Sequence, residues 1–294
     1  MQQTKLKKSN SVGRTYMIKS ILLPTDGSPN SKTAVQYGIY CAELFDAEII
    51  GLHVIDIRAL EGPFLSDISG SLGFSPYQNY LPKFQEILER RADLILEEFQ
   101  RQCSEKNIVP RLKKHIGIIA NIIADEAKKT DLVVIAQHGE HEKWSSGLLG
   151  STSESVVRKS PRPVLVTPGI FRTFSRILIA YDGGIESNKA LKIACELFSG
   201  KTFSLNAVYV TNNDERADEL QTEIEEFSNP YKIEMQYTRL QGDAGREILA
   251  YATAHNIDLI IMGAFSHSRI HDLILGGTTA YILRRSPIPV LLTR

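Results

Sequence analysis

Short apolar segments alternate with amphipathic segments along most of the chain. Residues 18–23, 48–55 and 132–136 are apolar runs with the length of buried strands. Between such runs, apolar residues recur at helical spacing, as in residues 31–45 and 81–106. Because a right-handed crossover helix covers one face of a parallel sheet, this alternation predicts an α/β fold.

The pattern occurs twice. Residues 160–167 read SPRPVLVT and residues 286–293 read SPIPVLLT. These segments are 126 residues apart (286 − 160), as are Gly150 and Gly276 (276 − 150). A repeat longer than the roughly 20–50 residues of a solenoid unit indicates two duplicated domains.

We expect each copy to be a five-stranded, mostly parallel sheet flanked by helices. The first copy is expected over residues 18–168 and the second over 176–294, with a linker at 169–175 and a flexible basic tail at 1–17. The expected strands of the first copy are residues 18–23, 48–55, 110–115, 132–136 and 164–167, and its expected helices are residues 31–45, 81–106, 119–129 and 151–159. The second copy repeats this order from Arg176 onward.

The first copy carries an insertion. Asp26 and Asp182 are 156 residues apart, whereas Asp131 and Asp258 are 127 apart, so the insertion measures 29 residues (156 − 127). Residues 57–80, with several Gly, Pro and Ser, are its expected place. A lid or partner-binding loop and a passive surface loop both fit this composition.

The last strands of the two copies are expected to pair with each other. Residues 164–166 and 290–292 are short apolar strands that would leave unpaired sheet edges if they were exposed. Pairing between the duplicated domains within one chain would satisfy their backbone groups.

Composition restricts the class of partner. The 34 Lys and Arg residues balance 34 Asp and Glu residues, so no global charge attracts nucleic acid or a membrane surface. The three cysteines show no paired spacing, which argues against a disulfide framework or a metal knuckle. No apolar run approaches the roughly 18 residues of a membrane span, and the N-terminus lacks the apolar core of a signal peptide. A soluble, cytoplasmic protein is expected.

A glycine-containing loop follows one strand in each copy. In the second copy, residues 260–263 end in glycine, and Gly276-Gly277-Thr278-Thr279 reads as a helix start. In the first copy, Gly139 and then Gly150-Ser151-Thr152-Ser153 follow a strand. Glycine lets the backbone approach a ligand, and free N–H groups at a helix start favour an anionic phosphate. The alternative is purely structural, because glycine at a strand end and at a helix cap is common.

These motifs resemble the universal stress protein family in its tandem form. The resemblance rests on Pro24-Thr25-Asp26 after the first strand, on residues 52–56 at the second, and on the glycine loops before Pro-x-Pro-Val-Leu. It covers nearly all of residues 18–294 and implies an adenine-nucleotide alpha-hydrolase-like, or Rossmann-like, fold. In the nucleotide-binding branch of that family, an Asp and a Val main chain hold adenosine, and the glycine loop with Ser or Thr holds ribose and phosphates.

The resemblance implies ATP, with or without Mg²⁺, as the ligand. The corresponding residues of the first copy are Pro24, Asp26, Val54, Gly139, Gly150, Ser151 and Ser153. Those of the second copy are Asp182, Val210, Gly263, Ser266, Gly276, Gly277, Thr278 and Thr279.

Both copies depart from the family pattern. In the first, Ala136 replaces the leading glycine, and ten residues (140–149) separate Gly139 from Gly150 where the family has nine. The second copy keeps nine residues (267–275), but Ser266 stands at the second glycine and Gly277 at the usual Ser or Thr. The retained spacing ranks the second copy slightly ahead as the nucleotide site.

Histidines and aspartates near the loops have simpler explanations. His138 with His141, and His267 with His271, lack a third ligand at a fixed spacing, so a solvated or phosphate-facing role is favoured over a metal site. Each strand-end aspartate precedes a glycine and could cap the following helix instead of contacting a ligand. The chain has no P-loop and no nucleophile elbow.

Two functional hypotheses remain from the sequence. The first is an ATP-binding, nucleotide-sensing regulator of a stress response, with at most slow hydrolysis because no general base or arginine finger is evident. The second is a non-nucleotide scaffold or small-ligand binder with degenerate loops. An adenine nucleotide is the expected partner, and a homodimer is compatible with either hypothesis.

Overall fold

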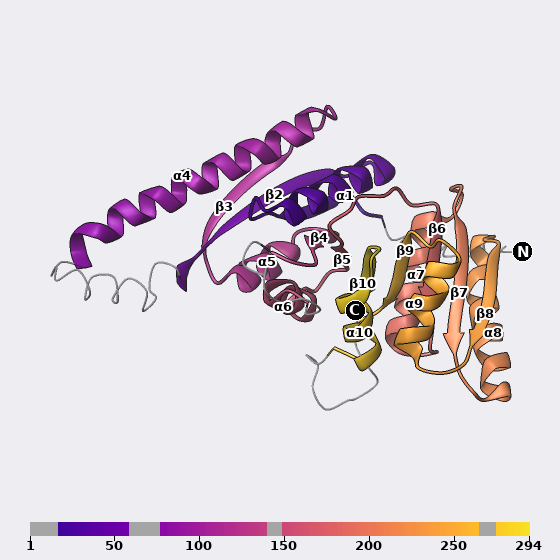
Figure 1. Ribbon diagram of the computed structural model, residues 1–294. Helices are drawn as coiled ribbons and strands as arrows, with labels where there is room; N and C mark the ends of the chain where they lie inside the picture. Colours follow the sequence, from indigo (N-terminus) through magenta and orange to yellow (C-terminus); the bar gives the residue numbers. More distant parts are fainter. Residues whose placement is uncertain (1–16, 59–76, 140–148, 265–274) are drawn as a thin grey trace, which may run out of the picture.

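The computed structural model describes residues 17–58, 77–139, 149–264 and 275–294 (Figure 1). The elements of the first copy are β1 (Ser20–Pro24), α1 (Pro29–Phe45), β2 (Glu48–Asp56), α4 (Tyr77–Ser104), β3 (Arg111–Gly117), α5 (Ile119–Ala127), β4 (Leu132–Ala136), α6 (Ser151–Lys159) and β5 (Val164–Thr167). Those of the second copy are β6 (Arg176–Ala180), α7 (Ile185–Phe198), β7 (Ser204–Val210), α8 (Asp214–Ser228), η1 (Asn229–Tyr231), β8 (Met235–Leu240), α9 (Ala244–Ala254), β9 (Leu259–Gly263), α10 (Gly277–Arg285) and β10 (Val290–Thr293).

All the described strands form one ten-stranded sheet in the order β3-β2-β1-β4-β5-β10-β9-β6-β7-β8. Within each copy the paired strands run parallel, as predicted. At the junction, β5 and β10 pair antiparallel, with Leu165 opposite Leu291. The predicted pairing of the two final strands is therefore confirmed, and it joins two five-stranded sheets into one.

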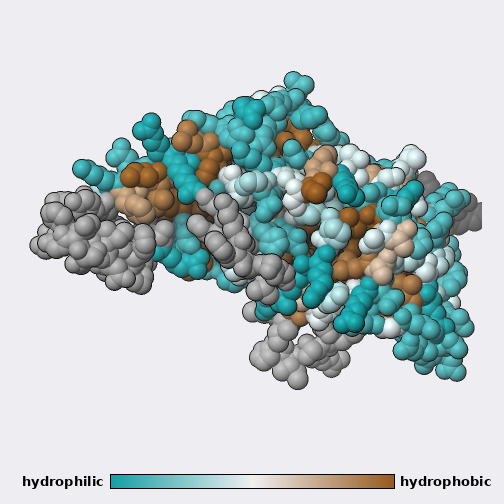
Figure 2. All heavy atoms as spheres, in the orientation of Figure 1, coloured by the Kyte–Doolittle hydropathy of each residue, from teal (hydrophilic) through white to brown (hydrophobic). Residues whose placement is uncertain are grey.

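Helices cover both faces of the sheet. One apolar cluster joins α1, α4, α7 and α8 to one face, and a second joins α5, α6, α9 and α10 to the other. Alternate residues of a central strand serve the two clusters, as Ile21 and Leu22 do in β1. Each cluster contains residues of both copies, so the copies share two continuous cores. On the side seen in Figure 2, hydrophilic residues cover most of the described surface.

In each copy, an aspartate side chain holds the backbone at the start of the first strand. Asp131 Oδ2 accepts hydrogen bonds from the N–H groups of Lys19 and Ser20, each 3.0 Å long. In the second copy, Asp258 Oδ2 accepts from the N–H groups of Ser175 (3.0 Å) and Arg176 (2.9 Å). Because charge-assisted bonds to a carboxylate are strong, each aspartate fixes the start of one strand beside its neighbour.

The structure corrects several predicted boundaries. Helix α1 begins at Pro29 instead of residue 31, α4 ends at Ser104 instead of residue 106, and β3 covers Arg111–Gly117 instead of residues 110–115. Helix α4 begins at Tyr77 instead of residue 81, so Pro82 lies inside the helix and not in its first turn. Helix α5 ends at Ala127, two residues before the predicted end. The predicted tail, except for Met17, and residues 59–76 of the predicted insertion lie outside the described residues.

Two tyrosines of α1 hold the connection between the copies. The Tyr37 hydroxyl donates to the Ile170 carbonyl (2.9 Å) and accepts from the Arg172 N–H (3.1 Å). The Tyr40 hydroxyl accepts from the Phe174 N–H (3.1 Å). Both rings also contact the phenyl rings of the connection, which therefore lies against the first copy.

A further contact joins α1 to the second copy. Lys201 Nζ donates to the Leu44 carbonyl (2.9 Å) and lies 5.5 Å from the centroid of the Phe45 ring. The rings of Phe45 and Phe198 have centroids 6.2 Å apart. These contacts hold the two copies together at a second place, in addition to the paired strands β5 and β10.

No helix within the described ranges has both the length and the apolar character that crossing a bilayer requires.

Alkaline pH is expected to weaken the fold through Tyr37. Burial raises the pKa of this phenol from 10.0 to about 12, partly offset by the bond from the Arg172 N–H. Because the folded state binds this proton more tightly than the unfolded state, the stability it contributes is present below pH 10 and is lost as the pH rises through 12. The pH-dependent contribution of Tyr37 to the free energy of unfolding is about 3 kcal/mol in total.

Unfolding by urea at several values between pH 8 and pH 12 tests this expectation. The Tyr37→Phe variant should be less stable at pH 8 by about 2 kcal/mol, since the two hydrogen bonds of the Tyr37 hydroxyl are lost. Its stability should then fall less steeply than that of the wild type between pH 10 and pH 12. Parallel pH profiles for the two proteins would contradict the assignment.

Candidate functional site

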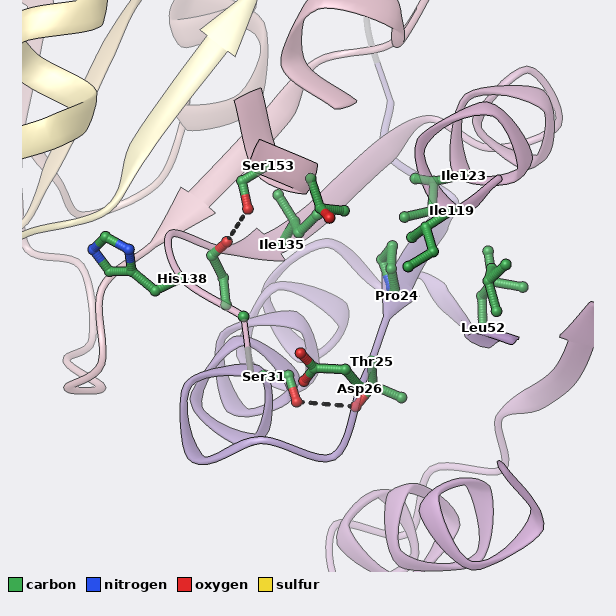
Figure 3. Close-up of a pocket in the computed structure, with 14 residues that line it drawn as sticks. Pro24, Thr25, Asp26, Ser31, Leu52, Ile119, Ile123, Ile135, His138 and Ser153 are labelled. Atoms are coloured by element: carbon green, nitrogen blue, oxygen red, sulfur yellow. Dashed lines mark hydrogen bonds between the residues drawn. The ribbon is translucent and has the colours of Figure 1, made fainter. Parts of the chain in front are cut away.

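The carboxyl ends of β1, β2 and β4 meet the first turns of α5 and α6 around a cavity of about 100 Å³ (Figure 3). Its apolar lining consists of Pro24, Leu52, Val54, Ile119, Ile123, Ile135 and Ala136. Its remaining lining consists of Thr25, Asp26, Ser31, His138, Gly139, Thr152 and Ser153. Ligand pockets commonly measure about 300–1,000 Å³, so this cavity can enclose only part of a nucleotide-sized ligand.

The Asp26 carboxylate shapes the turn between β1 and α1. Its Oδ1 accepts from the Ser28 N–H (2.9 Å), and Gly27 between them has φ +78°, a conformation that favours glycine. The second copy repeats this turn, with Asp182 Oδ1 accepting from the Gly184 N–H (2.9 Å). The helix caps are the residues that close these turns, Ser28 for α1 and Gly184 for α7. The alternative that the aspartates cap the helices is therefore wrong.

The other oxygen of Asp26 faces the end of β4. A Cβ built on Gly139 would lie 3.1 Å from Asp26 Oδ2, so the carboxylate lies directly beside that glycine. The two strand ends meet because the carboxyl ends of parallel strands lie at the same edge of the sheet. Figure 3 shows the His138 ring directed away from Asp26 and Pro24.

The hydroxyls of Thr25 and Ser31 are buried next to the Asp26 turn. Thr25 Oγ1 and Ser31 Oγ are 3.2 Å apart (Figure 3). Ser31 Oγ also donates to the Ser28 carbonyl (3.0 Å). His53 Nδ1 lies 2.8 Å from the Thr25 carbonyl oxygen. The sequence did not single out Ser31 or His53. Ser31 lies in the first turn of α1 and His53 inside β2, and neither position carries a local sequence signal for a cavity.

The first turn of α6 is tied to β4. The Gly150 N–H donates to the Gln137 carbonyl (3.0 Å), and Ser153 Oγ donates to the Ala136 carbonyl (2.7 Å). Ser153 is buried and has its proton committed to this bond. In α10 of the second copy, Thr279 Oγ1 donates in the same way to the carbonyl of Gly263 (3.2 Å). Both hydroxyls predicted to face a ligand therefore also fasten a helix to a strand.

The structure gathers most of the predicted residues of the first copy. Pro24, Asp26, Val54, Gly139 and Ser153 line the cavity. Gly150 is the N-cap of α6 and Ser151 is its first residue.

The predicted residues of the second copy lie at the corresponding elements. Asp182 follows β6, Val210 ends β7 and Gly263 ends β9. Gly276 is the N-cap of α10, and Gly277, Thr278 and Thr279 form its first turn. Ser266 lies outside the described residues.

A tyrosine distinguishes the second copy. Tyr181 stands where the first copy has Thr25 (181 − 156). Its hydroxyl lies 2.8 Å from Asn188 Oδ1 and 2.9 Å from Glu223 Oε2. Burial, followed by the Glu223 carboxylate, raises the pKa of this phenol, so the group stays protonated at neutral pH.

A carboxylate also distinguishes the second copy. Glu186, which corresponds to Asn30 of the first copy (186 − 156), packs so closely on Gly263 that a Cβ there would lie 2.7 Å from Glu186 Cβ. Its Oε1 accepts from Lys189 Nζ (3.0 Å), whereas Oε2 is buried and has no hydrogen-bond partner in the structure. The stem of Glu186 therefore packs on the end of β9, and the second copy carries a carboxylate where the first copy has the uncharged side chain of Asn30.

The described residues offer little for a metal ion. They contain no group of three or more His, Cys, Asp or Glu side chains placed to hold one. His141, His267 and His271 fall outside the described ranges. For these three, a solvated or phosphate-facing role therefore stays a prediction.

Comparison with known proteins identifies the family. The model of the universal stress protein family matches residues 17–168 and 210–294. The chain is 30% identical to universal stress protein Slr1230 of Synechocystis over 287 residues, which is 94% of this chain and all of that protein. It is also 30% identical to universal stress protein MJ0531 of Methanocaldococcus jannaschii over 152 residues, covering 51% of this chain and 82% of that protein.

A solved structure shares the whole fold. The crystal structure of a universal stress protein from Archaeoglobus fulgidus matches with a TM-score of 0.73 and 24% identity, covering 94% of this chain and 98% of that one. Two matched regions, a relative aligned over its full length and a common two-copy architecture agree with one another. The chain belongs to the universal stress protein family and carries two universal stress protein domains.

Proposed function

We propose that the chain binds an adenine nucleotide at the cavity of its first copy and acts as a nucleotide-sensing regulator of a stress response in the cytoplasm. The observation that carries the proposal is the cavity itself, where an apolar wall, a strand-end carboxylate and a helix start face one space. Binding sites of small molecules have this composition, with mostly apolar walls and a few polar groups that fix orientation.

The distribution of charge favours one orientation of the nucleotide. The apolar side chains of Leu52, Val54 and Ile119 suit a base. The Asp26 carboxylate can accept hydrogen bonds from base or ribose but repels phosphates. The start of α6 presents its first backbone N–H groups and the positive end of the helix dipole, which attract phosphates. Adenosine therefore belongs near Asp26 and the phosphates near Gly150 and Ser151.

The second copy suits phosphates less well. Glu186, whose Cβ packs on Gly263 and whose Oε2 is buried, adds a carboxylate to this copy that would repel a nearby anion. The uncharged Asn30 takes the place of Glu186 in the first copy. This charge difference supports the first copy as the nucleotide site, the reverse of the order that loop spacing alone suggests.

Hydrolysis, if it occurs, is slow. Phosphoryl transfer depends on cations that stabilise the developing charge, and the described lining of the cavity contains no Lys or Arg. Mg²⁺ commonly binds through substrate phosphates and one or two carboxylates, so we propose that it enters with the nucleotide. The protein then acts by binding and release.

Replacing Asp26 by Asn tests the adenosine end. Asparagine can still hold the turn, while the charge that accepts hydrogen bonds from base or ribose is lost. Isothermal titration calorimetry should show adenosine and ATP both bound about tenfold more weakly. Asp182→Asn is the matched control and should leave both affinities unchanged. Equal losses in the two variants would count against the first copy as the site.

Replacing Gly150 by Val tests the phosphate end. Its backbone has φ −55°, and that of Gly276 has φ −59°, so either position accepts a side chain without strain. Gly150→Val should weaken ATP binding about tenfold and adenosine binding by less than about twofold, because a side chain keeps phosphates from the helix start. Gly276→Val should change neither. A larger loss of ATP affinity in Gly276→Val would instead favour the second copy as the nucleotide site, as its loop spacing suggests.

Identification of a retained nucleotide tests the function as a whole. Acid quenching of the purified protein followed by chromatography should release an adenine nucleotide. Turnover of added ATP should stay well below the roughly 1–100 s⁻¹ typical of kinases. No retained nucleotide, together with no binding of ATP or adenosine in calorimetry, would favour a non-nucleotide scaffold.

A further inference from the structure

Gln137 occupies a junction between the cavity and the second copy. It directly follows β4, and its N–H donates to the Thr167 carbonyl at the end of β5 (2.8 Å). Its carbonyl accepts from the N–H of Gly150, the N-cap of α6 (3.0 Å). Its side chain crosses to the other copy, where Nε2 donates to the Leu283 carbonyl of α10. One residue therefore connects β4, the start of α6 and a helix of the second domain.

The Leu283 carbonyl is available because of a proline. A helical carbonyl normally accepts from the N–H four residues later, but that residue is Pro287, which has no N–H. Helix α10 ends at Arg285, and the Ser286 N–H bonds to the preceding carbonyl, that of Ile282 (2.8 Å). Leu283 is buried, and a buried carbonyl without a donor costs free energy. The Gln137 amide supplies the missing donor.

The repeat lacks the reciprocal bond. Val157 and Pro161 of the first copy correspond to Leu283 and Pro287, each 126 residues apart (283 − 157). Ala264 corresponds to Gln137 (264 − 137 = 127), and its N–H donates to Thr293 just as that of Gln137 donates to Thr167. Alanine has no side-chain donor, so Ala264 cannot reach the Val157 carbonyl. The side-chain bond is therefore present at Gln137 of the first copy and absent at Ala264 of the second.

We propose that Gln137 is a positioning residue through which α10 of the second copy fixes the phosphate end of the first copy's nucleotide site. The inference rests on the proposed nucleotide binding. The bond from its side chain to Leu283 holds the backbone of residue 137, whose carbonyl sets the position of Gly150 and of the first turn of α6 that follows. Asp26 follows β1 and Val54 lies in β2, whereas the Gln137 side chain is bonded to α10 and not to these strands.

Gln137→Met is the direct test, because methionine keeps the length of the side chain and removes its donor. In calorimetry on the full chain, the Kd of ATP should rise about 3–10-fold, the value of one hydrogen bond. The Kd of adenosine should change by less than about twofold. One matched control should behave as the wild type: Lys201→Met, which removes a different side-chain bond between the copies, that to the Leu44 carbonyl.

Hydrogen exchange on the protein without nucleotide provides a second measurement. Amides of residues 150–154 should exchange about 3–10-fold faster in Gln137→Met than in the wild type, and at the wild-type rate in Lys201→Met. An unchanged exchange rate would overturn the proposal, as would equal losses of ATP and adenosine affinity. Faster exchange in a protein that binds neither ligand would instead keep the positioning role and reject the nucleotide function.

Discussion

The antiparallel pairing of β5 and β10 is the constraint on which the rest of the molecule depends. Each copy alone would end in a short apolar strand with one unpaired edge, and residues 164–166 and 290–292 cover each other's backbone groups. Their side chains enter both apolar clusters, so the cores of the two copies become continuous. The same pairing brings the helices that follow the two glycine loops close to the opposite copy.

The two outer edges of the sheet, β3 and β8, carry charged side chains instead of pairing with another of the described strands. Strand β3 carries Lys113 and Lys114, which pair with Glu126 and Asp93, and charged side chains of this kind discourage pairing with another chain. At the opposite end, Arg239 of β8 pairs with Asp214 at 2.5 Å. Since the apolar edges are already used within the chain, a homodimer would have to form through another surface.

Sequence periodicity predicted the fold well because the central strands are buried on both faces. Such strands, as β1 and β4, read as continuous apolar runs, and the duplicated ending of each copy marked the strands that pair. The start of α4 was missed because Pro82 resembles a residue of a first helical turn. Convergence of Asp26 and Gly139 could be predicted, since parallel strands end at one edge of the sheet.

Other features of the site depend on tertiary packing and left no local pattern. Whether Ser28 or Asp26 would cap α1 depends on how the turn closes, which neighbouring residues alone do not determine. The contact of Glu186 with Gly263 joins residues from different elements, and that of Gln137 with Leu283 spans 146 positions of the chain. Duplication allows such asymmetry, because one copy can lose features of a ligand site while its helices still support the other. The alanine at position 264 and the glutamine at position 137 are consistent with the proposed division, in which the first copy binds the ligand and the second supports it.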